Sequence, residues 1–187
     1  MIGVVNGVPG HVLLVHGAVV LVPLTALFLV VCALWASVAR RLSWLVPLLG
    51  LITLVLVVLS TESGEWLEER VEESALMERH TELGGGLTPW AAALFVLTLV
   101  VWWVGRAVAR RPPGAGGRQD VPEDDRPRGG GSGAARTVSS LPVRIVVLLG
   151  ALAVAVGATV QVYRIGDSGA KAVWEGNFSQ SQGDDKR

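Results

Sequence analysis

Four long apolar runs, separated by polar segments, dominate the pattern along the chain. We expect transmembrane helices over residues 12–39, 42–60, 90–109 and 143–163. Each run has about 19–28 residues, enough for a helix to cross the roughly 30 Å hydrocarbon core of a bilayer. The runs are too long for strands and lack period-two alternation, and a lone segment in lipid must satisfy its own backbone polar groups. The pattern predicts an all-α membrane protein, a four-helix transmembrane bundle.

Composition supports this class. Of the 187 residues, 51% are hydrophobic and 17% charged, the mean hydropathy is +0.51, and the charges fall between the apolar runs. The formal net charge is zero, so no global basic field points to nucleic acid; the expected partner is the lipid bilayer. The single cysteine, Cys32, rules out an intrachain disulfide and a covalently attached c-type haem.

Arginine placement predicts the orientation. Arg40 and Arg41 separate the first two runs, and more arginines gather from Arg106 to Arg144. Because basic residues favour the cytoplasmic side, both loops are expected inside and both termini outside, in a bacterial cytoplasmic (inner) membrane. The remaining segments are then an outer N-terminal segment (1–11), a disordered cytoplasmic linker rich in Gly, Pro and charge (110–142), and an outer C-terminal tail (164–187).

Residues 61–89 form an acidic extracytoplasmic loop in this scheme, and the loop contains helix formers throughout. Ser63 is expected to cap the start of an amphipathic helix, and Gly84–Gly86 to end it. One apolar stripe at four-residue spacing comprises Leu67, Val71 and Ala75. We expect this helix to lie at the outer surface with its apolar side on the bundle.

Small residues recur through the run 143–163. Ala151, Ala155 and Thr159 keep a four-residue spacing, as do Ala153 and Gly157. This spacing lets helix backbones approach closely in lipid. It predicts that the fourth span packs most tightly against the others.

The three histidines all fall in the outer half of this scheme. His11 and His16 are five residues apart, which turns a helix by about 140°, so they are not expected to aim at one point. The predicted pair is therefore His16 with His80, with His11, Glu65 and Gln161 around them. Two imidazoles from different helices could ligate the iron of a b-type haem, and would also suit a metal ion or a quinol site.

Several passages resemble the bacterial membrane-protein family catalogued as domain of unknown function 2231. These are GHVLLVHGAVVLVPLTAL, RRLSWLVPLLGLITLVLVVLSTESGEWL, ERHTELGG and VYRIGDSGAKAVW. The resemblance carries over to His11, His16, Pro23, Glu65, His80, Gly166 and Gly169. Asp167 departs from it, because many relatives have a histidine there. Some relatives are fused to cytochrome c or Rieske modules, so the resemblance implies a redox setting.

The first functional hypothesis is therefore a membrane redox component, with haem b held by His16 and His80 near the outer face and a redox partner or a second copy of the chain beside it. The alternative is a non-catalytic accessory or scaffold protein that docks a partner through its acidic outer helix. A transporter is less favoured, because no charged residue lies mid-span and no inverted repeat is evident. No catalytic motif is present, so the sequence favours a protein that is not an enzyme.

Overall fold

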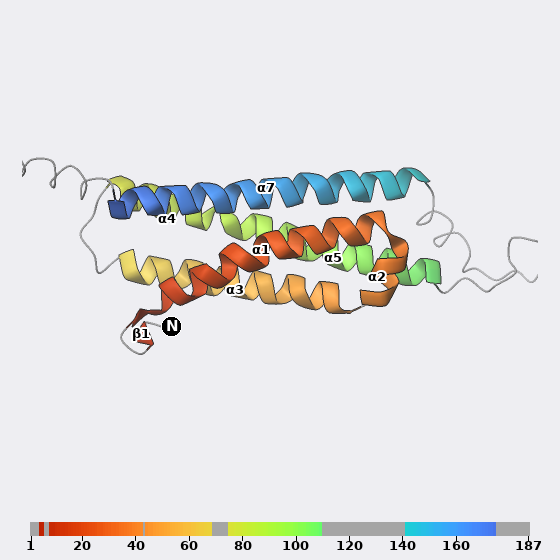
Figure 1. The fold of residues 1–187 in the computed structure, drawn as a ribbon, viewed down its shortest axis with the longest axis horizontal. Helices are drawn as coiled ribbons and strands as arrows, with labels where there is room; N and C mark the ends of the chain where they lie inside the picture. Colours follow the sequence, from red (N-terminus) through yellow and green to blue (C-terminus); the bar gives the residue numbers. More distant parts are fainter. Residues whose placement is uncertain (1–3, 6–7, 43, 69–74, 110–140, 175–187) are drawn as a thin grey trace, which may run out of the picture.

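The computed structural model describes residues 4–5, 8–42, 44–68, 75–109 and 141–174 (Figure 1). The described elements are strands β1 (Val4–Val5) and β2 (Val8–Pro9) and helices α1 (Gly10–Leu34), α2 (Ala36–Leu42), α3 (Leu45–Glu68), α4 (Ala75–Gly85), α5 (Leu87–Ala109) and α7 (Leu141–Trp174). The two short strands pair antiparallel, Val4 with Pro9 and Val5 with Val8. The expected outer segment 1–11 thus holds the paired strands β1 and β2 and the first two residues of α1.

Four helices run side by side along the long axis of the molecule (Figure 1). Helix α1 packs on α3 and α7, and α5 packs on the same two, which closes a four-helix ring. Among the described helices, these four are long and apolar enough to cross a membrane. The predicted all-α architecture with four spanning helices is confirmed.

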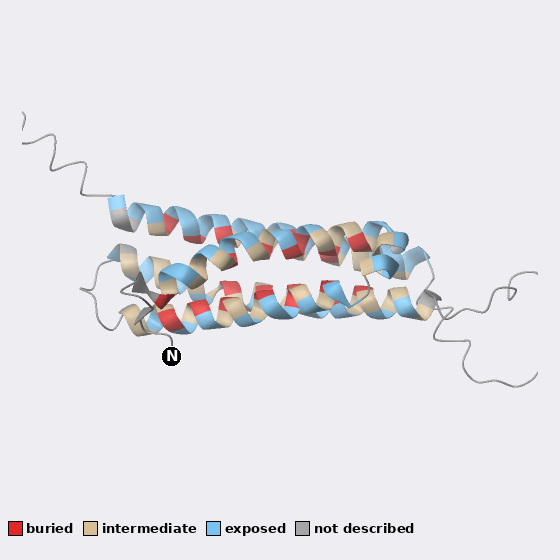
Figure 2. Cartoon of the chain, turned by 60° about the horizontal axis from the view of Figure 1, so that its bottom comes forward, coloured by how far each residue is buried: buried red, intermediate tan, exposed pale blue. Residues whose placement is uncertain are grey.

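The outer face of the bundle is apolar, and its mainly hydrophobic interior also contains buried hydroxyl groups. Thr25, Thr53 and Thr98 are fully buried, whereas Val20 is 63% exposed and Val146 69% (Figure 2). Thr53 donates a 2.9 Å hydrogen bond to the Leu49 carbonyl, so Thr25 donates the 2.7 Å bond between their hydroxyls. Polar contacts between helices and apolar outer faces suit a bundle whose solvent is lipid.

The first span ends earlier than predicted. Helix α1 stops at Leu34, and α2 begins at Ala36 and turns to contact α5. The expected span 12–39 merged the two, because apolar composition alone carries no signal for this break. Arg40 and Arg41 lie in the last turn of α2, where cations favour the negative end of the helix dipole.

The structure differs from the predicted single amphipathic helix between Ser63 and Gly84–Gly86. Helix α3 continues to Glu68, and a separate 11-residue helix α4 ends at Gly85. Ser63 is buried inside α3 and donates to the Ser60 carbonyl at 3.0 Å, so it is not an N-cap. Val71, which the expected stripe needs, lies outside the described residues, and the surface role of α4 stays a prediction.

The fourth span is longer and less buried than predicted. Helix α7 runs to Trp174, so the start of the expected tail 164–187 is helical, because Ile165 and Ser168 are buried where α7 meets α4. Only 17% of its most apolar window is buried, against 28–33% in the other spans. Its small residues occur on both faces, and Ala153 and Thr159 are exposed. Most of the predicted linker, residues 110–140, lies outside the described residues.

Candidate functional site

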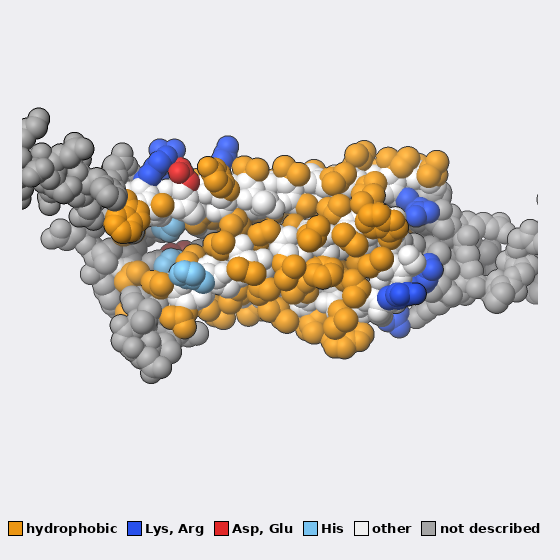
Figure 3. All heavy atoms as spheres, viewed as in Figure 1, with side chains coloured by type: hydrophobic (Ala, Val, Ile, Leu, Met, Phe, Trp, Pro, Cys, Tyr) orange, Lys and Arg blue, Asp and Glu red, His pale blue; other side chains and the backbone are white. Residues whose placement is uncertain are grey.

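A cavity of about 230 Å³ opens at the end of the bundle that carries His11 and His80, called here the histidine end. It is lined from α1, α3, α4, α5 and α7, mostly by apolar side chains such as Val15, Val57 and Leu87. The surface is hollowed beside the pale blue histidine side chains (Figure 3). A pocket at the end of a bundle with few polar groups has the usual character of a small-molecule site.

His11 enters this cavity from the first turn of α1. Its Nδ1 lies 2.9 Å from the backbone carbonyl of Ser60 on α3. A carbonyl can only accept, so Nδ1 carries the hydrogen and donates it. In the neutral ring, Nε2 then keeps a free lone pair.

His80 enters the same cavity from α4. Its Nδ1 lies 3.0 Å from the hydroxyl of Ser168 on α7. That hydroxyl donates its one hydrogen to the Ile165 carbonyl at 2.9 Å, so it accepts from His80. The Nδ1 of His80 is therefore also the donor, and its Nε2 is also left with a lone pair.

A glycine lies against each imidazole. A Cβ on Gly64 would come 3.1 Å from Cε1 of His11, and one on Gly169 would come 3.0 Å from Cε1 of His80. Both distances are shorter than the roughly 3.5–4.0 Å of an ordinary carbon contact. Each ring is thus held by a hydrogen bond at Nδ1 and by a glycine close to its Nδ1–Cε1 edge.

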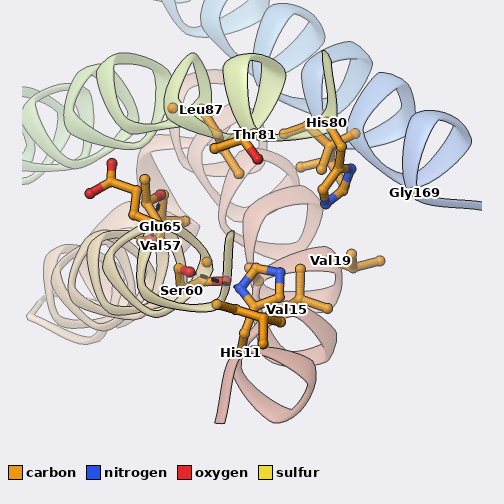
Figure 4. A pocket seen from close by; sticks show the side chains of 18 of the residues that line it. His11, Val15, Val19, Val57, Ser60, Glu65, His80, Thr81, Leu87 and Gly169 are labelled. Carbon is orange, nitrogen blue, oxygen red and sulfur yellow. Dashed lines mark hydrogen bonds between the residues drawn. The ribbon is translucent and has the colours of Figure 1, made fainter. Parts of the chain in front are cut away.

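The two rings lie in the same cavity and are turned toward each other (Figure 4). The nearby hydroxyls of Thr61 and Thr81 donate to carbonyls of their own helices, Val57 at 3.0 Å and Met77 at 3.1 Å. What these four side chains offer a ligand is therefore lone pairs, not hydrogens. The cavity favours a ligand that donates hydrogen bonds or accepts electron pairs.

The histidine pair differs from the expected one. His16 is exposed on α1 and bonds the Val12 carbonyl of its own helix, away from the cavity. The structure brings together His11 and His80, because the 140° turn that separates His11 from His16 directs only His11 toward α3. Glu65 is a lining residue, but it is exposed and lies across the cavity from His80 (Figure 4).

Gln161 has a structural position. Its amide donates a 2.8 Å hydrogen bond to the Leu83 carbonyl near the end of α4. A Cβ on Gly86, between α4 and α5, would come 3.0 Å from the same amide nitrogen. Gln161 therefore fixes the α4–α5 turn against α7 and holds His80 in place indirectly.

Three contributors to the site were absent from the sequence prediction: the Ser60 carbonyl, Gly64 and Ser168. Ser60 and Gly64 are four residues apart, so they share one face of α3. That spacing of small residues is the one signal that could have indicated a close approach by another helix. Nothing in the sequence connects Ser168 to His80, 88 residues away.

Within the described ranges, no group of three or more His, Cys, Asp or Glu side chains could hold a metal ion. The donor set of the site is two imidazole nitrogens. Such a pair can fill the two axial positions of a haem iron or accept two hydrogen bonds, and it is a poor match for a bare metal ion, which takes more ligands.

The fold and this site define the class of the protein, a multi-pass membrane protein with a two-imidazole pocket at one end of its bundle. Comparison of the chain with protein-family models, with curated proteins and with solved structures found no match. The resemblance to the family of unknown function 2231 therefore stays a prediction.

Proposed function

We propose that this membrane protein is a redox-linked component that binds a quinol headgroup between His11 and His80. The observation that carries the proposal is the pair of Nε2 lone pairs turned into one apolar cavity. A quinol ring has two hydroxyl donors on opposite sides, so each can donate to one imidazole. The expected family membership accords with a redox role, and the positive-inside rule would set this end on the outer face.

The hydrogen-bond donors and acceptors of the two imidazoles determine which oxidation state of the ligand fits the site. A quinone has two carbonyls and accepts only, so it gains nothing from unprotonated Nε2 atoms. The reduced ring donates twice and satisfies both. The site is thus expected to prefer quinol over quinone while both imidazoles are neutral.

The haem hypothesis is the second candidate, now with His11 in place of His16. Ligating histidines usually donate their other ring nitrogen to a carbonyl or similar group, and both imidazoles here do so. The volume argues against it. A cavity of about 230 Å³ lies below the roughly 300–1,000 Å³ of pockets for drug-sized ligands, so a porphyrin would need the helices to separate.

The test is binding of decylubiquinol and decylubiquinone to the full chain in mild detergent at pH 8, followed by quenching of tryptophan fluorescence. Each hydrogen bond contributes about 0.5–1.5 kcal/mol, so His11→Ala or His80→Ala should weaken quinol binding about 2–10-fold. His16→Ala is the matched control and should leave the affinity unchanged. Equal affinity of the wild-type chain and the His11→Ala, His80→Ala double variant would refute the proposal.

The same preparation separates the two remaining candidates. A Soret band after expression with haem supply, lost in the His80→Ala variant, would favour the haem. Neither a Soret band nor a preference for quinol would favour the accessory or scaffold protein, whose acidic helix should then retain a partner in a mild-detergent pull-down. That role has no contact in the structure to support it.

A further inference from the structure

A second cavity lies at the opposite end of the bundle, called here the arginine end because it carries Arg40, Arg41, Arg106 and Arg144 (Figure 3). Its volume is about 110 Å³, and it is lined from α1, α2, α5 and α7. Arg40 and Arg144 line it from two different helices. The rest of its wall is apolar, including Val101, Val104 and Val147.

The charges at this end are uncompensated within the described ranges. The described carboxylates are Glu62, Glu65, Glu78, Glu82 and Asp167, and they belong to the segments at the histidine end. Arg106 stacks on Trp102, 4.9 Å from the ring centroid. Arg40 and Arg144 have no acidic partner among the described residues, so two guanidinium groups border a cavity with no matching anion from that part of the chain.

Three tryptophans indicate where this cavity lies relative to a bilayer. Trp35, Trp44 and Trp103 are exposed at the arginine end, 55–60% each. Tryptophan favours the headgroup level of a membrane. The cavity, with cations at its rim and apolar side chains on its wall, therefore lies where the phosphates of a lipid leaflet meet the acyl chains.

We propose that Arg40 and Arg144 bind the phosphate of an anionic phospholipid, with the start of an acyl chain against Val101, Val104 and Val147. Guanidinium groups match phosphate oxygens in charge and geometry, and basic pockets between membrane helices recognise such headgroups. This site is independent of the histidine end.

The experiment uses the full chain in mild detergent, titrated with phosphatidylglycerol or with phosphatidylcholine of the same acyl chains. Bound lipid is counted by native mass spectrometry. Each arginine near an anionic headgroup raises the affinity for that lipid roughly fivefold. The Arg40→Gln, Arg144→Gln variant should therefore lose roughly 30-fold in affinity for phosphatidylglycerol. The control is Arg41→Gln, Arg106→Gln, which removes the same charge from the same end but spares the cavity, and it should keep the preference.

Other outcomes overturn the proposal. Equal retention of both lipids by the wild-type chain would do so, as would equal losses in the two double variants, which would indicate a diffuse charge effect. Excess inorganic phosphate provides the remaining arm. If phosphate stabilises the wild-type chain but not the Arg40→Gln, Arg144→Gln variant, and phosphatidylglycerol has no advantage over phosphatidylcholine, the site takes free phosphate and the lipid assignment is wrong.

Discussion

Replacing Gly157 by alanine tests the packing of α7 on α5. The new Cβ would overlap Cζ3 and Cη2 of the Trp90 ring, far inside the roughly 3.5–4.0 Å of a relaxed contact. The indole must therefore move, or α7 must shift. Overpacking of this kind costs about 1–3 kcal/mol.

Gly150→Ala is the matched control on the same helix, because a Cβ there meets nothing within 4 Å. It carries the helix-propensity gain of the substitution, about 0.5–1 kcal/mol, without the clash. The difference between the two variants isolates the packing term and should equal about 1–3 kcal/mol, or several degrees in melting temperature for a chain of this size. The assay is thermal unfolding in mild detergent. Equal melting temperatures for the two variants would refute the α5–α7 packing described here.

Three further predictions follow from single contacts. Thr53→Val should destabilise the bundle by about 1–3 kcal/mol, more than Thr25→Val does, because it leaves the Thr25 hydroxyl without an acceptor. Thermal unfolding of both single variants and of the double variant measures these losses, and equal losses of stability in the two single variants would contradict the prediction. Ser168→Ala should weaken quinol binding several-fold, because His80 loses the acceptor that fixes its tautomer; unchanged affinity would contradict the assignment of the free nitrogen. Asp167→Asn should change stability by less than about 0.5 kcal/mol, because its 2.9 Å pair with Lys171 is an exposed i,i+4 pair; a larger loss in the same unfolding assay would show that this turn carries more of the fold than its exposure indicates.

The spans were predictable because the bilayer imposes a length and a composition that a single sequence displays directly. The run at 90–109 lies inside α5, and the run at 42–60 coincides with α3 from Leu45 onward. The residues at which the helices end could not be predicted to the same degree. Helix α3 continues through a polar stretch to Glu68, and α7 continues to Trp174, because buried serines and Ile165 face neighbouring helices there and tertiary contact overrides polarity.

The site was half predictable. The sequence shows that ionisable residues near a span need partners, which identifies histidines as candidates. Choosing between His11 and His16 requires the rotation of α1 about its axis. That rotation depends on close approaches such as that of Gly17 to Leu56, where an added Cβ would come 2.8 Å from Cδ2 of Leu56. No periodic signal in a helix that is apolar on all sides reveals it.

Nitrogen NMR can show which ring nitrogen of each histidine carries the hydrogen, because the chain has three histidines and single variants assign their signals. The full chain, labelled with ¹⁵N in its imidazole rings, would be measured at pH 8 in lipid nanodiscs with and without decylubiquinol. We expect Nδ1 to carry the hydrogen in both His11 and His80, and the quinol to shift the Nε2 signal of both while His16 stays unchanged. A hydrogen on Nε2 of either ring, or shifts confined to His16, would contradict it.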